Sequence, residues 1–267
     1  MMDPAALYDA CHTSLVRCLS TVAEHCPDIP ASAPPLHRLR NVAQVLVSTA
    51  PPRGDYPETD LTLAQSFNLL STSQELLMTL RGAGAAGRIS GEIHQSLSAA
   101  VDALAAQIAA SLREARALRV RGLYVIIDPQ VTNERDPLKV AASAVRGGAR
   151  MLQLRDKLRD KGELLPAARY LHQLCQDNDV DLIINDHADL ATVVGCAGLH
   201  LGQTDLPVAE ARQVLSSEQV LGRSNHELDE LVQSQDMGAD HLAFGAIYAT
   251  GTKGLGRPPQ GVDQLRR

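Results

Sequence analysis

Two aspartates, Asp186 and Asp205, each follow a short apolar run of the kind that forms a buried strand, and nineteen positions separate them. If the two strands are parallel neighbours, both carboxylates lie at the same edge of the sheet. Mg²⁺ prefers carboxylate oxygens, water and substrate phosphates as ligands, so the pair could hold this ion. Asp is also a favoured N-cap, so spacing alone leaves metal binding and helix capping equally open.

A cationic cluster precedes the two aspartates. The run QLRDK places Gln153, Arg155 and Lys157 two residues apart, so their side chains point to the same side of an extended strand end. Cations at strand ends are often merely solvated, but beside a carboxylate pair they suit a magnesium-bound diphosphate. Farther along, the stretch ATGTKG suits a phosphate through its hydroxyls, backbone N–H groups and ammonium, although it lacks the spacing of a Walker P-loop. It contributes Thr250, Gly251, Thr252 and Lys253.

The elements that would position these residues begin at Leu123. From there, short continuous apolar runs alternate with amphipathic stretches, which is typical of parallel strands covered on both faces and joined by helices. The expected strands are 123–127, 150–154, 181–184, 198–201, 219–222 and 241–245. The expected helices are 136–147, 162–177, 187–194, 207–216 and 226–237.

Such a series fits either a doubly wound sheet or a (β/α)8 barrel. Active sites of barrels gather at the C-terminal ends of many strands, and polar residues end almost every strand here. We therefore predict a TIM-type barrel. The strand-end residues are Asp128; Gln153, Arg155 and Lys157; Asn185 and Asp186; Gln203 and Asp205; Arg223 and Ser224.

The first part of the chain has a different pattern. Apolar residues recur at helical spacing from Ile93 to Leu112, and segments 4–25, 36–49 and 60–81 behave similarly between stretches rich in helix breakers. We predict an all-α bundle of four helices over residues 1–118, followed by the α/β domain over residues 119–267.

Composition limits the function classes. The formal charge is −6, with basic residues interspersed among acids, which argues against a general nucleic-acid-binding protein. The five cysteines form no CxxC pair and no secretory signal opens the chain, so reduced thiols in the cytoplasm are expected. The longest apolar runs are far below the roughly 18 residues of a membrane span. We expect a soluble cytoplasmic protein that does not enter membranes.

The ordered motifs resemble the thiamine phosphate synthase family. The matching pieces are LYVIID, GGARMLQLRDK, LIINDHADLA, GLHLGQTDLPV, LGRSNH and AFGAIYATGTKG, and together they cover about residues 121–265. The helical N-terminal part lies outside the resemblance. As a set of six in this order, the motifs are highly specific.

The resemblance implies a transferase of thiamine biosynthesis that uses two small-molecule substrates and Mg²⁺. Pyrimidine diphosphate would lose pyrophosphate and join thiazole phosphate to give thiamine phosphate. Asp186 and Asp205 would hold the metal ion, and Arg155, Lys157 and Lys253 would act in catalysis. The implied substrate contacts are Gln153, Leu154, Arg155, Asp156, Lys157, Asn185, Ser224, Thr250, Gly251, Thr252 and Lys253.

The chain departs from the family pattern at its end. The family has eight βα units and six are visible here, so we expect a barrel truncated after the sixth unit. Either the sequence is a fragment or a shortened gene product, or the gap is covered, for which the helical part and a second copy in a homo-oligomer are the candidates. Two alternatives remain open. One is the sister enzyme thiazole tautomerase, which needs no diphosphate clamp. The other is a non-catalytic protein with a degenerate barrel that binds a ligand or partner.

Overall fold

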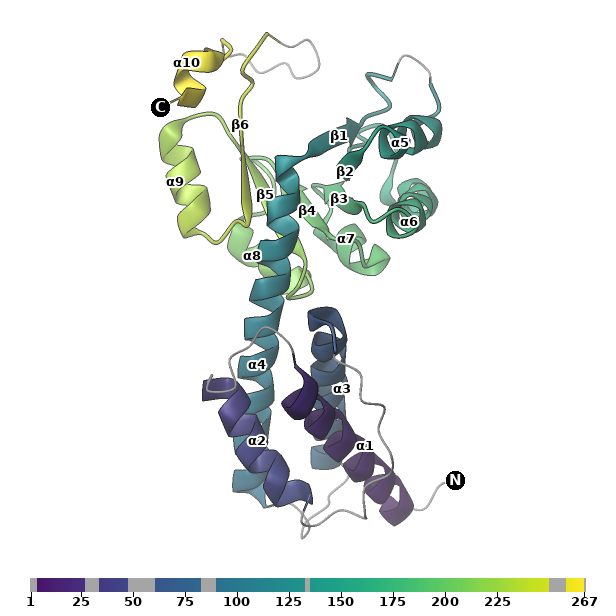
Figure 1. Ribbon diagram of the computed structural model, residues 1–267. Coiled ribbons are helices and arrows are strands. Elements are labelled where there is room, and N and C mark those ends of the chain that lie inside the picture. Colours follow the sequence, from purple (N-terminus) through teal and green to yellow (C-terminus); the bar gives the residue numbers. More distant parts are fainter. Residues whose placement is uncertain are drawn as a thin grey trace. The chain divides into compact units, whose positions relative to one another are not determined.

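The computed structural model describes residues 4–26, 34–47, 61–82, 90–132, 135–249 and 258–266. Contacts divide the chain into two compact units, Met1–Leu112 and Arg113–Arg267. Each unit has a hydrophobic core of its own. Figure 1 shows the elements of both units in order along the chain.

The first unit contains four described helices: α1 (Pro4–His25), α2 (Pro34–Val47), α3 (Leu63–Gly82) and most of α4 (Gly91–Ala117). They share one core, to which α4 contributes one face. The helical spacing read from the sequence is confirmed there, because Leu97, Val101, Leu104 and Ile108 are all buried. None of the described helices is long and apolar enough to cross a membrane.

The second unit is built on a parallel sheet of six described strands in the order β1-β2-β3-β4-β5-β6. Every strand pairs with the next one in the sequence. A doubly wound sheet reverses its strand order at a switch point, so the observed order rules out that alternative. The strands are β1 (Leu123–Ile127), β2 (Ala149–Leu154), β3 (Asp181–Asn185), β4 (Gly198–Leu201), β5 (Val220–Asn225) and β6 (His241–Phe244).

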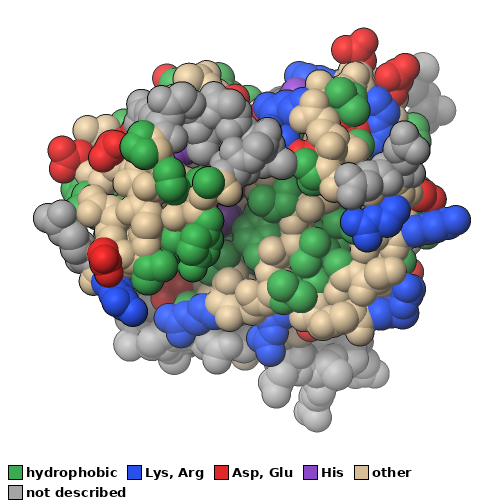
Figure 2. All heavy atoms as spheres, turned by 90° about the horizontal axis from the view of Figure 1, so that it is seen from above, with side chains coloured by type: hydrophobic (Ala, Val, Ile, Leu, Met, Phe, Trp, Pro, Cys, Tyr) green, Lys and Arg blue, Asp and Glu red, His purple; other side chains and the backbone are tan. Residues whose placement is uncertain are grey.

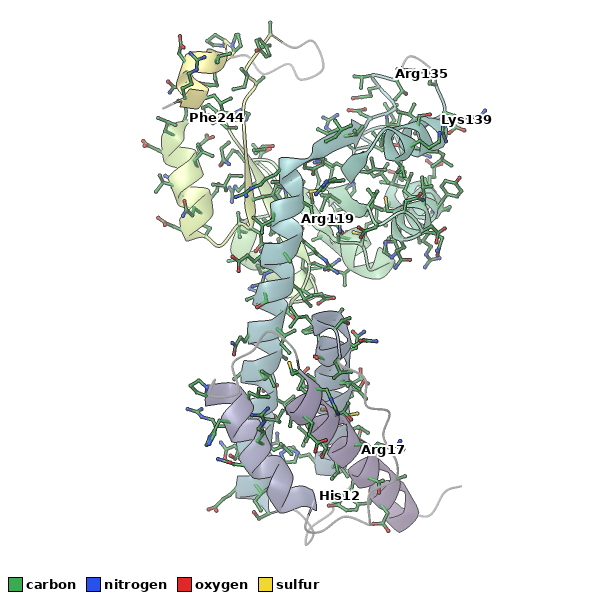
Figure 3. The ribbon with its side chains drawn as sticks, viewed as in Figure 1. His12, Arg17, Arg119, Arg135, Lys139 and Phe244 are labelled. Atoms are coloured by element: carbon green, nitrogen blue, oxygen red, sulfur yellow. The ribbon has the colours of Figure 1, made fainter. Side chains whose placement is uncertain are left out.

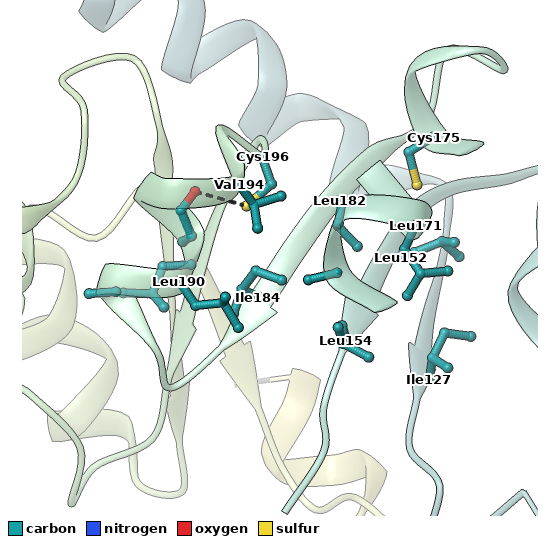
Figure 4. Packing of buried hydrophobic residues seen from close by; sticks show 14 of the residues in the cluster. Ile127, Leu152, Leu154, Leu171, Cys175, Leu182, Ile184, Leu190, Val194 and Cys196 are labelled. Atoms are coloured by element: carbon teal, nitrogen blue, oxygen red, sulfur yellow. Dashed lines mark hydrogen bonds between the residues drawn. The ribbon is translucent and has the colours of Figure 1, made fainter. Parts of the chain in front are cut away.

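Helices connect the strands and cover one face of the sheet. Alternate residues of the strands, such as Leu152, Leu182 and Leu199, pack against these helices in the larger core (Figure 4). This is the pattern expected for strands buried by crossover helices. The connecting helices are α5 (Pro137–Arg146), α6 (Lys161–Gln176), α7 (Ala188–Val194), α8 (Val208–Val214) and α9 (Leu228–Asp236), and α10 (Gly261–Arg266) follows β6.

The sheet is strongly curled. Tyr124 on β1 and His241 on β6 belong to opposite edge strands, yet their ring centroids lie 6.2 Å apart. Five strand spacings in a flat sheet would separate those strands by about 24 Å. The face opposite the helices is therefore concave, and the residues that alternate with the helix-facing ones point into it.

The segment before β1 packs on the second unit. Val120, in the short 3-10 helix η1 (Leu118–Arg121), packs against a small buried cluster of the concave face that includes Met151 and Ile183. Arg119, labelled in Figure 3, pairs with Asp181 at the start of β3, with a nitrogen–oxygen distance of 3.0 Å. The end of α4 and the whole of η1 therefore belong to the second unit, and η1 packs where the strands begin.

Close strand packing gives a first test of the fold. A Cβ at Gly198 on β4 would lie 2.1 Å from the carbonyl oxygen of Val220 on β5. We expect Gly198→Ala to lower the free energy of unfolding of the second unit by about 1 to 3 kcal/mol, because backbone must shift. Gly162→Ala is the control, since a Cβ there meets nothing within 4 Å. In a helix it should be neutral or stabilise by up to about 1 kcal/mol. Urea unfolding measures both; equal effects would contradict the close β4–β5 packing.

Candidate active site

The polar residues predicted from the sequence gather where the parallel strands end. β1, β2, β3 and β4 are consecutive neighbours, so the loops that follow them lie side by side at one edge of the sheet. Figure 2 looks toward this edge and shows a surface that is hollowed at its centre and lined with hydrophobic side chains. The concave face and this edge together form the candidate site.

The first ion pair of the site joins the ends of β1 and β2. The guanidinium Nη1 of Arg155 contacts Oδ2 of Asp128, whose other oxygen accepts a hydrogen bond of 2.9 Å from the Gln130 amide. The Arg155 side chain is 14% exposed and that of Asp128 is 6% exposed. Both oxygens of Asp128 are therefore engaged, and the pair holds the guanidinium in place at the edge.

The second ion pair joins the ends of β2 and β3. The ammonium of Lys157 contacts Oδ2 of Asp186. Lys157 is 42% exposed, whereas the Asp186 side chain is 13% exposed. The backbone of Asp186 has a φ of 62°, in the left-handed region that few residues other than Gly, Asn and Asp adopt. A carboxylate held in this way marks a constrained position, as is common at functional sites.

Asp205 lies in the loop after β4. Its Oδ2 accepts a hydrogen bond of 2.6 Å from the amide of Gly202, which closes the loop on itself. Burial lowers the pKa of the nearby His187 imidazole; Lys157 also lowers it, whereas Asp205 opposes the shift. Asp205 and Lys157 thus both lie within electrostatic reach of one imidazole next to Asp186.

The structure decides against the capping interpretation of the two aspartates. The N-cap of α7 is His187 and that of α8 is Pro207. Asp186 precedes its helix by one further residue, and Asp205 bonds backward to Gly202 instead of forward into α8. Their carboxylates are therefore available for a role other than starting a helix.

Each of the two carboxylates keeps an oxygen that a cation such as Mg²⁺ could bind. Within the described residues, Oδ1 of Asp186 and Oδ1 of Asp205 accept no hydrogen bond, so each carboxylate keeps one oxygen for a ligand. The described chain has no group of three or more His, Cys, Asp or Glu side chains that could hold a metal ion. Two carboxylates without a full protein cage suit an ion that keeps water and substrate phosphates as its other ligands.

Three predicted substrate contacts lie on the concave side. Gln153 is buried, and its Nε2 donates a hydrogen bond of 2.8 Å to the Tyr124 hydroxyl. Ser224 Oγ is joined to His200 Nε2 by a hydrogen bond of 2.9 Å. Asn185 ends β3 and pairs in register with His200. The structure brings these side chains to the same face as Arg155.

The side chains of Leu154 and Asp156, two further predicted substrate contacts, are engaged within the protein. The Leu154 side chain is buried in the core under the helices, because it alternates with Gln153 and Arg155. The Asp156 side chain is fully buried and binds the Leu158 amide and the Arg159 guanidinium. Burial alone would raise the pKa of Asp156, but these hydrogen bonds lower it overall. Both side chains support the loop, which leaves only their backbone for a substrate.

Arg223 was predicted to follow the fifth strand at the mouth of the barrel. Its side chain does not point there. β5 continues to Asn225, so Arg223 lies within the strand and faces the helix-covered side. Its guanidinium contacts Gln203 Oε1 at 3.3 Å and Met237 Sδ at 3.6 Å. The predicted contacts Thr250, Gly251, Thr252 and Lys253 lie outside the described residues.

Comparison with known proteins decides the family. A family model described as thiamine monophosphate synthase matches residues 123–267, which is more than half of the chain and includes the sheet and the site. The chain belongs to the thiamine monophosphate synthase family.

Named relatives agree with this assignment. A thiamine-phosphate synthase of Thioalkalivibrio sulfidiphilus is 46% identical over 137 residues, covering 51% of this chain and 64% of that protein. One from Moorella thermoacetica is 40% identical over 144 residues, covering 54% of this chain and 69% of its own length. The chain thus spans about two thirds of the length of these relatives, and somewhat less for the first.

A solved structure supports the same fold. The thiamine phosphate pyrophosphorylase of Pyrococcus furiosus is 29% identical, with a TM-score of 0.50, and the match covers 56% of this chain and 70% of that one. In this chain an α/β fold with a parallel sheet carries the region that matches the thiamine monophosphate synthase family.

Three polar rings lie together on the concave face: that of Tyr124, which is partly buried, and those of His200 and His241, which are buried. Neither Tyr124 nor His241 was predicted there from the sequence. The centroids of His200 and His241 lie 5.7 Å apart, and Tyr124 meets His241 edge to face. The signal that could have found them is a polar ring at an inward-facing position of an otherwise apolar strand, as in LYVII, GLHL and HLAF.

Burial gives His241 a measurable effect on stability. It lowers the pKa of the imidazole from 6.5 to about 4, with the charge of Asp240 opposing in part. As pH falls from about 6.5 to about 4, the unfolded chain gains a proton that the folded chain does not take up, so stability is lost in this window, by up to about 3 kcal/mol.

His241→Phe should remove this loss. His172 and His187, whose pKa values burial also lowers, are present in both proteins and cancel in the difference. Denaturant unfolding across the pH window measures it for the wild type and the variant. Parallel stability curves for the two proteins would contradict a neutral buried His241.

Proposed function

We propose that this chain is a thiamine phosphate synthase. It would join 4-amino-2-methyl-5-(diphosphooxymethyl)pyrimidine to thiazole phosphate, giving thiamine phosphate and pyrophosphate. The observation that carries the proposal is the alternation of charges along the ends of β1 to β3, where Arg155 pairs with Asp128 and Lys157 with Asp186. Family membership and the names of the relatives support it.

We propose further that the curled sheet corresponds to six units of a (β/α)8 barrel and that residues 1–118 form a separate helical domain. Consecutive parallel strand order and the strong curl support the barrel. The two compact units, each with its own core, support the division into domains.

The diphosphate would occupy the strand-end edge. Its oxygens would bind Arg155 and Lys157, and Lys253 is the proposed third cation. Arg155 and Lys157 each have a carboxylate partner that fixes the position of the cation. N–H donors remain for the diphosphate, because a guanidinium has five donors and an ammonium three. Asn185 would add a neutral contact beside them, and Ser224 would contact the pyrimidine part of the same substrate.

The reaction replaces one bond by another without net proton transfer. The bond between the pyrimidine methylene carbon and the diphosphate oxygen breaks, and its electron pair leaves with the pyrophosphate. The thiazole nitrogen then donates its lone pair to the methylene carbon. Arg155 and Lys157 would stabilise the negative charge that grows on the leaving group, in a setting where fixed charges act more strongly than in water.

Mg²⁺ bound by Asp186 and Asp205 would supply further positive charge to the diphosphate oxygens. The aminopyrimidine ring stabilises positive charge at its methylene carbon, so departure of pyrophosphate can run ahead of attack and no general base is required. The thiazole phosphate would contact the stretch from Thr250 to Thr252. The hollow in Figure 2 would limit the access of water to the reacting carbon.

Isothermal titration of the full chain with the pyrimidine diphosphate tests the proposed clamp. We expect saturable binding with Mg²⁺ and binding weaker by about tenfold or more without it, since the ion that Asp186 and Asp205 would hold supplies positive charge to the diphosphate. Lack of binding in both conditions would overturn the proposal and favour a non-catalytic role. Isomerisation of a thiazole precursor without any diphosphate binding would instead identify a tautomerase.

A further inference from the structure

The rings of Tyr124, His200 and His241 form a continuous layer on the concave face, beside the proposed substrate contacts. His241 lies between the other two rings, at centroid distances of 6.2 Å from Tyr124 and 5.7 Å from His200. Tyr124 comes from β1, His200 from β4 and His241 from β6. This layer therefore links strands that are far apart in the order of the sheet.

Two polar side chains of the proposed site are each bonded to a ring of this layer. The Gln153 amide donates to the Tyr124 hydroxyl at 2.8 Å, which turns its carbonyl oxygen away from the tyrosine as a free acceptor. Burial raises the pKa of Tyr124 to about 12, so the hydroxyl stays protonated. In the His200 tautomer that carries its proton on Nε2, the hydrogen bond of 2.9 Å is donated to Ser224 Oγ, which orients the serine and leaves its O–H free to donate.

His241 itself makes no such bond. Its side chain is buried, and neither ring nitrogen has a hydrogen-bond partner within the described chain. Space for the ring is provided by Gly222 on β5, where an added Cβ would lie 2.0 Å from His241 Nε2 and 2.7 Å from His200 Nδ1. Burial of a polar ring without a hydrogen-bond partner is unfavourable by itself. The contacts of His241 with the neighbouring rings are therefore the reason we consider for its presence.

We propose that His241 is a positioning residue of the active site: its ring holds Tyr124 and His200 in place, and thereby fixes the directions in which Gln153 and Ser224 meet the pyrimidine ring. This inference rests on the proposed function. An aminopyrimidine offers an amine donor and ring-nitrogen acceptors in one plane, so it needs an acceptor and a donor with fixed directions. A fixed Gln153 carbonyl and a fixed Ser224 hydroxyl provide both.

Two ligands separate this role from a general effect on folding. Pyrophosphate with Mg²⁺ reports on the strand-end clamp alone, whereas the pyrimidine diphosphate reports on the clamp and the ring contacts together. His241→Ala should weaken binding of the pyrimidine diphosphate about tenfold, because two oriented hydrogen bonds are loosened, and should leave pyrophosphate affinity unchanged. His241→Phe should restore binding to within about threefold of the wild type, because the role depends on the ring and not on its nitrogens.

A second variant avoids the cavity that His241→Ala creates. Tyr124→Phe keeps the ring and removes only the hydroxyl that binds Gln153. It should weaken binding of the pyrimidine diphosphate by about three- to tenfold, again without a change for pyrophosphate. Calorimetric titration well below the melting temperature of each variant provides the affinities.

Three results would overturn the positioning role of His241, and a fourth would overturn the proposed function. Equal affinity of His241→Ala and the wild type for the pyrimidine diphosphate would overturn the positioning role, and so would a parallel loss of pyrophosphate binding. Failure of His241→Phe to restore binding would also overturn it. If the wild type bound the pyrimidine diphosphate no better than pyrophosphate, the proposed function would fail, irrespective of His241.

Discussion

Replacement of Lys157 by glutamine is expected to weaken Mg²⁺-dependent binding of the pyrimidine diphosphate by about 30- to 100-fold. The reason is the loss of a charge-assisted contact to the diphosphate, worth about 1.5 to 3 kcal/mol, together with the loss of the partner that holds Asp186. Lys157 is chosen over Arg155 because its side chain is 42% exposed, whereas removal of Arg155 would leave the buried Asp128 unpaired.

Lys161→Gln is the matched control for this variant. Lys161 lies four residues farther along and pairs with Asp189 on α7 at 2.8 Å, so it is the same kind of ion pair between the same parts of the chain. Lys161 lies outside the proposed clamp, and the side chains of Lys161 and Asp189 are both more than half exposed. We expect affinity within about twofold of the wild type. Equal losses from Lys157→Gln and Lys161→Gln would show that net charge, and not the clamp, attracts the diphosphate.

Asp186→Asn should abolish the dependence of diphosphate binding on Mg²⁺ and lower affinity in its presence by about 100-fold. The fold should be retained, because asparagine tolerates the left-handed backbone that residue 186 adopts, with a φ of 62°. Asp189→Asn is its control, since that carboxylate also pairs with a lysine but lies on α7 and is 57% exposed.

Titration with and without the metal ion, and thermal unfolding without ligand, check this prediction. Retention of a large Mg²⁺ effect in Asp186→Asn would remove Asp186 from the metal site. A melting temperature lowered by more than about 5 °C would point to a structural role for the carboxylate instead, because a shift of that size corresponds to roughly 1 to 2 kcal/mol in a unit of this length.

The sequence predicted the elements well because their periodicity is local. Continuous apolar runs such as 123–127 and 198–201 are bounded by polar residues, and the structure places strands at the same positions. The strand-end position of Asp186 and Asp205 followed from the same pattern. The end of β5 was less clear, because Arg223 and Asn225 remain in the strand although they are polar.

Contacts between distant strands could not be predicted in this way. Which cation pairs with which carboxylate depends on loops that only the folded sheet brings together, as Lys157 and Asp186 show. The role of Tyr124 and His241 depends on the curl of the sheet, since strands at its two edges meet only because it bends. The alternation of side chains along a strand already predicts that Leu154 is buried. The resemblance, however, implied substrate contacts for all five residues of QLRDK, whichever way their side chains point.

The proposed function requires that the strand-end cations and carboxylates promote the transfer of the pyrimidine methylene group from pyrophosphate to thiazole phosphate. The most direct test incubates the full chain with the pyrimidine diphosphate, thiazole phosphate and Mg²⁺, and follows thiamine phosphate and pyrophosphate together by chromatography and mass spectrometry. The account predicts that both products form in equal amounts, and that Lys157→Gln slows both while Lys161→Gln slows neither. Pyrophosphate released without thiamine phosphate, or neither product at any enzyme concentration, would contradict it.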